Sequence, residues 1–162
     1  MAVSVPLAPR FNAITGLDPV ADFDDGTVSS DIVNASMAKA VHFIVHQGVG
    51  ATGTRTYTVE ACDDVSASNV SAVPFWYQQC LATGTSDVMA AAPVLKTTTG
   101  VLTTAGSGQI HVISVDADVL AHVGYKFVRL KMVEGTNSPV LAGILVLVES
   151  QVPRAIPATQ IA

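Results

Sequence analysis

Residues 40–46 read AVHFIVH, and this stretch decides the fold of the chain. Apolar side chains at every second position share one face of an extended chain, and the other face carries His42, Ile44 and His46. β-branched and aromatic residues dominate, which favours a strand over a helix. The sequence therefore predicts a strand with one buried face. We expect His42 and His46 to face solvent or an interface and not to share a metal ion, because they would lie about 13 Å apart along the strand.

The same two-residue period recurs in segments separated by turns rich in Gly, Thr and Ser. The clearest are residues 55–62, 73–80, 109–115, 125–133 and 140–149. Weaker strand signals lie around residues 89–96 and 101–104, and Asp116 is expected to cap one helical turn over residues 116–122. About seven or eight short strands predict an all-β fold, an antiparallel β-sandwich or barrel that is jelly-roll-like.

Two details of this fold follow from the local sequence. The glycine-rich residues 48–53 predict a hairpin that joins residues 40–46 to residues 55–62. Neighbouring rings in a strand point to opposite faces, so the three aromatic residues 75–77 are not expected to form one platform for stacking on sugars. We expect Trp76 in the core, with its two aromatic neighbours on the opposite face of the sheet.

The distribution of prolines divides the chain into three parts. Three prolines fall within residues 1–36, which we predict to be an N-terminal arm and acidic loop with one short strand around residues 11–14. Residues 37–150 are predicted to form the β-sandwich domain. Residues 151–162 contain two further prolines and are predicted to form an extended C-terminal arm.

The composition points to an assembly more than to a free catalyst. Of the 162 residues, 49% are hydrophobic and only 13% are charged, about half of the usual charged fraction. Mean hydropathy is +0.47, yet the longest apolar run, residues 139–148, covers only about half of a membrane span. A net charge of −5 argues against nucleic acid as the main partner, and no basic segment at the start predicts a signal peptide. Such a domain is expected to cover much of its surface with other subunits.

The charged residues are unevenly distributed along the chain. Five aspartates between Asp18 and Asp31 lie in a segment without Lys or Arg, whereas Lys126, Arg129 and Lys131 cluster near the other end. Solvated faces are the favoured interpretation. Complementary patches between neighbouring subunits are the alternative.

No residue pattern specifies a catalytic, cofactor-binding or metal site. Asp22, Asp24 and Asp25 lack the terminal carboxylate ligand of a calcium loop, so a surface turn is favoured. Cys62 and Cys80 end two strands that we expect to be neighbours. A disulfide between them is one alternative, two free thiols are the favoured one, and a bridge between subunits is a third.

Three stretches together resemble a known class of proteins. They are residues 11–34 (FNAITGLDPVADFDDGTVSSDIVN), 53–64 (GTRTYTVEACDD) and 124–149 (GYKFVRLKMVEGTNSPVLAGILVLVE). With these stretches the chain resembles small all-β structural proteins of tailed bacteriophages and prophages, in particular capsid decoration (cement) proteins. The resemblance supplies no set of binding residues.

The resemblance implies a non-enzymatic virion protein that binds the outer surface of the phage head and stabilises it. The implied partners are the major capsid protein and further copies of the chain, as a homotrimer, with no nucleic acid, membrane or cofactor. Such a protein is made in the host cytoplasm and ends in the virion. Residues 2–11 and 152–162 are the expected contact arms, since arms that order on docking can cover large areas.

Two other functions remain open from the sequence. A tail or neck structural protein would share all of these features. A carbohydrate-binding host-adhesion module would differ by exposing aromatic side chains to solvent.

Overall fold

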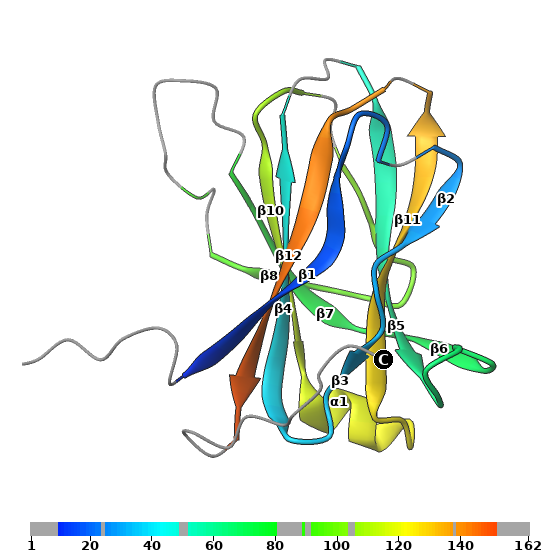
Figure 1. Cartoon of the computed structure of the whole chain (residues 1–162), viewed down its shortest axis with the longest axis vertical. Coiled ribbons are helices and arrows are strands. Elements are labelled where there is room, and N and C mark those ends of the chain that lie inside the picture. Colours follow the sequence, from blue (N-terminus) through cyan, green and yellow to red (C-terminus); the bar gives the residue numbers. More distant parts are fainter. Residues whose placement is uncertain are drawn as a thin grey trace, which may run out of the picture.

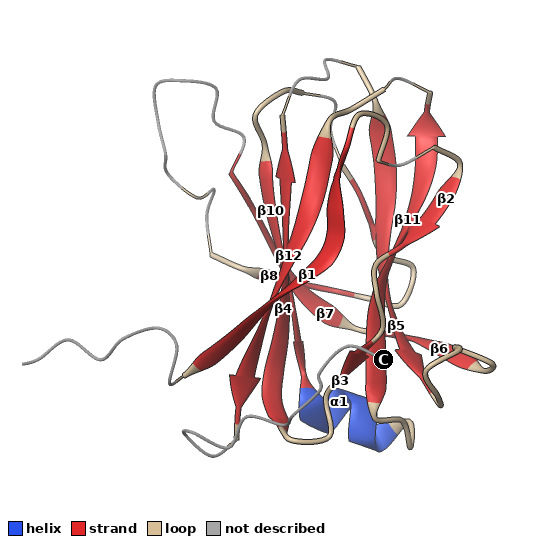
Figure 2. Ribbon diagram, in the orientation of Figure 1, coloured by secondary structure: helices blue, strands red, loops and turns tan. Residues whose placement is uncertain are grey.

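The computed structural model describes residues 10–23, 25–48, 52–80, 89, 92–103, 106–137 and 139–151. Its strands form two antiparallel sheets that pack face to face as a sandwich and do not close into a barrel (Figure 1). Figure 2 shows that strands dominate the described chain and that α1 is the helix at one end of the sandwich. The all-β prediction is confirmed, with the sandwich as the form that the fold takes.

The first sheet contains six strands, in the order β1-β12-β4-β10-β7-β8. In that order their bounds are Phe11–Val20, Ala142–Ser150, Ala38–Gln47, Ile110–Asp116, Phe75–Cys80 and Val94–Lys96. The predicted strand 40–46 is thus β4, and it lies in the interior of the sheet between β12 and β10.

The second sheet also contains six strands, four of them in the order β2-β11-β5-β6. Their bounds are Thr27–Ser29, Phe127–Thr136, Thr54–Cys62 and Val70–Val73. The short strand β3 (Val33–Asn34) pairs with β11, and β9 (Val101–Leu102) pairs with β5. The chain passes from one sheet to the other several times, so strands that follow each other in sequence often lie in opposite layers.

The hydrophobic core fills the space between the two sheets. Phe43, Val45 and Ile113 contribute from the first sheet, and Val59 and Leu130 from the second, all fully buried. The helix α1 (Ala117–His122) closes one end and buries Leu120. Asp116 occupies the N-cap position, as predicted, although its side chain donates and accepts no capping hydrogen bond there.

The predicted hairpin of β4 with β5 is wrong. β4 pairs with β10 and β12 in the first sheet, whereas β5 pairs with β11, β6 and β9 in the second. The segment that joins them therefore connects the two layers instead of turning within one. Alternation of side chains shows that each strand has an inner face, but it does not show which strand provides the hydrogen-bonding partner.

The predicted position of Trp76 is also wrong. Its side chain is 42% exposed, whereas Phe75 and Tyr77 are buried. The prediction that Trp76 faces away from its two neighbours holds, but the inner face is the opposite one. Two rings on the inner face bury more apolar surface than one ring would, which favours this orientation.

The region before residue 37 contributes more structure than an arm and a loop. β1 spans ten residues instead of a short strand around residues 11–14, and β2 and β3 belong to the second sheet. β1 tolerates Pro19 because it is an edge strand with register shifts on either side of Leu17. The sandwich therefore begins before residue 37. Of the predicted contact arms 2–11 and 152–162, the first lies outside the described residues up to residue 9 and the second lies outside them entirely.

Candidate functional site

The outer face of the first sheet is the candidate site, and the strand register defines it in three rows. The first row is Ala13, Leu147, His42, Ser114, Trp76 and Leu95. The second is Thr15, Leu145, Ile44, Val112 and Gln78, and the third is Gly143, His46, Ile110 and Cys80. These positions alternate with the core residues of the same strands, so they point away from the second sheet. Cys80, at the end of the third row, is nevertheless buried.

The three rows of this face are mostly apolar, and their polar members are Thr15, His42, His46, Gln78 and Ser114. No Asp, Glu, Lys or Arg occupies any position of the three rows. Leu95 is 57% exposed and Leu145 is 45% exposed, and Ile44, Val112 and Leu147 are partly exposed between them. The register makes Leu145, Ile44 and Val112 direct neighbours, with Leu147 beside them on β12. Leu95 lies at the other flank next to Trp76, with Ser114 and His42 between this pair and Leu147.

A hollow of about 580 Å³ lies at the β1–β12 side of this face. Leu17, Ile44, Leu141 and Leu145 line it together with small residues such as Gly143. A Cβ atom on Gly143 would lie 3.0 Å from the Pro19 ring, so a larger residue there would crowd the neighbouring strand. Because Gly143 has no side chain, this part of the face stays hollow.

A second depression, of about 430 Å³, adjoins Trp76 on the β7 side. His42, Gln78, Ser114 and Asp116 bring polar groups to it. His42 Nδ1 lies 2.8 Å from Ser114 Oγ in a hydrogen bond. Burial lowers the pKa of His42, which outweighs the opposing effect of the nearby Glu149 carboxylate. An aromatic ring beside several hydrogen-bonding groups can bind a ligand with both apolar and hydroxyl surfaces.

Charged groups gather at one end of this face, beyond the three rows. Glu149 accepts a hydrogen bond from Arg10 at 3.1 Å and forms an ion pair with Lys39 at 3.6 Å. Both cationic side chains are largely exposed, so these pairs are rim features that contribute little to stability.

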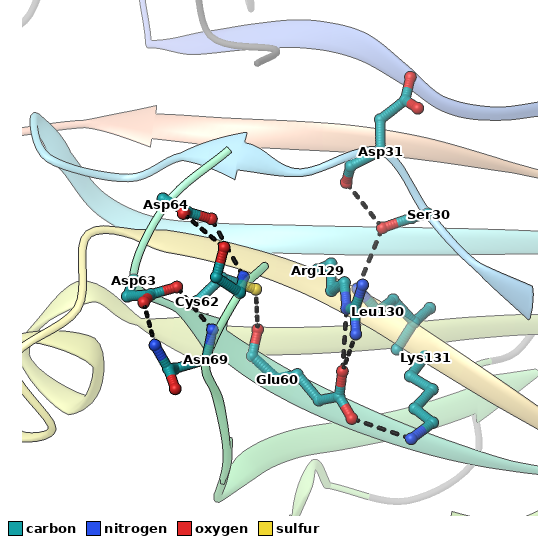
Figure 3. A network of polar contacts seen from close by, with 11 residues as sticks. Ser30, Asp31, Glu60, Cys62, Asp63, Asp64, Asn69, Arg129, Leu130 and Lys131 are labelled. Atoms are coloured by element: carbon teal, nitrogen blue, oxygen red, sulfur yellow. Dashed lines mark hydrogen bonds and ion pairs between the residues drawn. The ribbon is translucent and has the colours of Figure 1, made fainter. Parts of the chain in front are cut away.

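The outer face of the second sheet has a different character, because it is charged. Glu60 accepts two hydrogen bonds from Arg129, at 2.9 and 2.7 Å, and one from Lys131 at 3.1 Å (Figure 3). Arg129 lies opposite Glu60 across β11 and β5, and Lys131 is the next residue on the same face of β11, so the predicted basic cluster is neutralised in part within the chain. The interpretation of Arg129 and Lys131 as a solvated face is consistent with this arrangement.

The neighbouring acidic pair belongs to a turn. Asp63 accepts hydrogen bonds from the backbone and side chain of Asn69 (Figure 3). Asp64 accepts hydrogen bonds from Ser66 and Ser68. These hydrogen bonds lower the pKa of both carboxyl groups. The two aspartates therefore shape the loop between β5 and β6.

A buried polar chain lies inside the sandwich, and sequence reasoning missed it. Tyr77 donates to Gln79 at 2.8 Å, so His111 Nδ1 must be the donor in its 2.8 Å contact with the Tyr77 hydroxyl. His111 Nε2 then accepts from Gln47 Nε2 at 3.0 Å, and that amide also donates to Tyr57. Burial, with a smaller contribution from the positive charge of Arg55, lowers the pKa of His111 to about 4. The sequence held one signal for this chain of contacts: alternation places the polar side chains of His111 and Gln47 on the inner faces of their strands.

The structure places the two cysteines in different sheets. Both are free and buried, Cys62 at the end of β5 and Cys80 at the end of β7, and these strands are not neighbours. Burial raises the pKa of Cys62 to about 11. Among the described residues, no group of three or more His, Cys, Asp or Glu side chains is placed to hold a metal ion. In that same part of the chain, no helix combines the length and the apolar composition needed to cross a membrane.

Comparison with protein families, with curated proteins and with solved structures finds no match for this chain.

Proposed function

We propose that this chain is a non-enzymatic structural protein of a virion, most specifically a capsid decoration protein that binds the outer surface of a phage head as a homotrimer and stabilises it. The observation that carries the assembly role is the set of three mostly apolar rows on the outer face of the first sheet, which contain no Asp, Glu, Lys or Arg. An apolar surface of this extent costs free energy in water and gains it when a partner covers it. The proposal that the chain is part of a virion is supported by the resemblance of residues 11–34, 53–64 and 124–149 to phage structural proteins.

The copy number of the chain in purified particles tests this proposal. Particles from the phage or prophage that encodes the chain would be analysed by quantitative mass spectrometry against their major capsid protein. A decoration protein is expected in a copy number comparable to that of the capsid protein. Six or twelve copies per particle would assign the chain to the tail or neck instead, and its absence from particles would overturn the virion role.

A carbohydrate-binding role is the second candidate, and the exposure of Trp76 favours it. The ring adjoins the depression that His42, Ser114 and Asp116 also line. A sugar could stack on the indole while its hydroxyl groups bind the polar side chains. Because Trp76 is the only tryptophan, its fluorescence reports binding directly during titration with saccharides. The Asp116→Asn variant should weaken a true response, and an unchanged response in that variant would exclude this site.

A further inference from the structure

We infer that a second copy of this chain covers the outer face of the first sheet, with the Trp76 flank of one copy in the Gly143 hollow of the next. This inference rests on the proposed function, since it names the partner of the same surface. The two flanks lie on opposite sides of the sheet: Trp76 and Leu95 on β7 and β8, and the hollow at β1 and β12.

The shape of the face supports contact between unlike flanks. Trp76 and Leu95 are exposed, large and adjacent, so they raise the β7–β8 flank. On the β1–β12 flank, Gly143 and Thr15 are small and the hollow measures about 580 Å³. When copies are related by an axis parallel to the strands, the raised flank of each copy meets the low flank of another. Such an arrangement closes as a pair or as a ring of three.

The absence of charge favours a second copy as the occupant. When identical surfaces meet, any charge on the surface approaches a like charge or must find a partner across the contact. The three rows of this face contain no Asp, Glu, Lys or Arg, so two copies can approach without repulsion. The charged groups Arg10, Lys39 and Glu149 lie at one end of the face, beyond the rows. Asp116 lies at the same end and lines the depression beside Trp76, so the contact must leave its carboxylate in water or give it a partner.

The size of the face sets the strength of the contact. Its fifteen positions, about 4.8 Å apart across the strands and about 7 Å apart along them, give a surface of about 500 Å² per copy. Two such surfaces bury about 1,000 Å², the lower end of the area that a biological interface buries. The contact is therefore expected to be reversible and to depend on protein concentration.

The test combines absolute mass with the fluorescence of the single tryptophan. Light scattering coupled to size exclusion gives the mass of the full chain, and acrylamide quenching measures how accessible Trp76 is. The wild-type chain is expected to show a mass two or three times that of the 16.7 kDa chain, with Trp76 protected. Dilution that lowers the mass should increase quenching in parallel.

Two variants and a matched control locate the contact. Leu145→Lys and Thr15→Lys each place a charge at the low flank, and both positions are exposed within one copy. Each variant is expected to give the mass of one chain and a freely quenched Trp76. Val133→Lys introduces the same charge at a 38% exposed position on the second sheet and should behave as wild type. Circular dichroism checks that all variants keep the β fold.

The outcomes separate this inference from the proposed function. A wild-type chain that remains a single copy at its highest soluble concentration overturns the inference. So does an oligomer that survives both Leu145→Lys and Thr15→Lys with Trp76 still protected. In either case, virion copy number still decides the proposed function, because a capsid protein would then be the partner that covers this face.

Discussion

His111 forms its hydrogen bonds as a neutral imidazole, because its Nε2 atom accepts a hydrogen bond from Gln47. Its pKa is about 4 in the folded chain and 6.5 in a free side chain. Above pH 6.5 both states are neutral and stability is complete. Between pH 6.5 and 4 the unfolded chain binds a proton that the folded chain does not, so His111 should remove about 3 kcal/mol of stability across this range.

Chemical denaturation at several pH values measures this loss. The His111→Gln variant provides the control, since it cannot titrate at this position. The difference in unfolding free energy between wild type and variant should shrink as the pH falls from 7 to 4. Parallel stability curves for the two proteins would contradict a neutral, buried His111.

Cys62 should be inert in the folded protein. Its side chain is fully buried and its pKa is about 11, so at pH 8 only about one thiol in a thousand is ionised. In a Cys80→Ser variant, which isolates Cys62, a thiol reagent should react no faster than the protein unfolds. Denaturant should restore rapid labelling. Fast labelling of the folded variant would show that this end of β5 opens readily.

At the scale of the strand and its turns, two glycines provide a matched test of backbone geometry. Gly100 and Gly124 both have positive φ, +84° and +80°. A Cβ atom on Gly124 meets open space, whereas one on Gly100 would collide with the Tyr57 carbonyl oxygen. Gly124→Ala should cost about 1 kcal/mol from strain alone. Gly100→Ala should cost about 2 kcal/mol more, because β9 must move away from β5.

Thermal and denaturant unfolding of the two alanine variants measure this difference. Equal destabilisation would mean that the turn before β9 adjusts without cost. The comparison is informative because φ is nearly the same at both positions, so the contact with Tyr57 is the variable.

The strands themselves were predictable, but their partners were not. Alternation identified β4, β10 and β11, because the inner and outer side chains of each differ in character along the sequence. Pairing depends on whether a connection turns within a layer or crosses to the other, and glycine-rich residues 48–53 are compatible with both. The same limit applies to Trp76. Alternation separates it from Phe75 and Tyr77, but only the packed sandwich decides which face is inside.

The candidate site was predictable in part for the same reason. The outward direction of His42, Ile44 and His46 follows from the sequence of β4 alone. The surface formed by the three rows does not follow from the sequence, because it joins side chains from six strands that the register brings together. The buried chain through His111 likewise depends on contacts between β4, β5, β7 and β10.

At the scale of the whole molecule, the outer faces of the two sheets differ in charge. The second sheet presents partly exposed Arg129 and Lys131, which neutralise the buried Glu60 carboxylate. The first sheet presents three mostly apolar rows that contain no Asp, Glu, Lys or Arg. In the assembly that we propose, the charged outer face stays in solvent and the rows of the first sheet are covered, which would suit a chain with only 13% charged residues.

The asymmetry predicts how self-association responds to salt. Contacts through the uncharged face gain their free energy from burial of apolar surface, which sodium chloride does not screen. The mass measured by light scattering should therefore stay the same between about 0.05 and 1 M sodium chloride, and sodium sulfate should strengthen association. Contacts through the Arg10, Lys39 and Glu149 rim would weaken instead, because exposed ion pairs are screened. Dissociation at high salt would move the interface from the three rows to that rim.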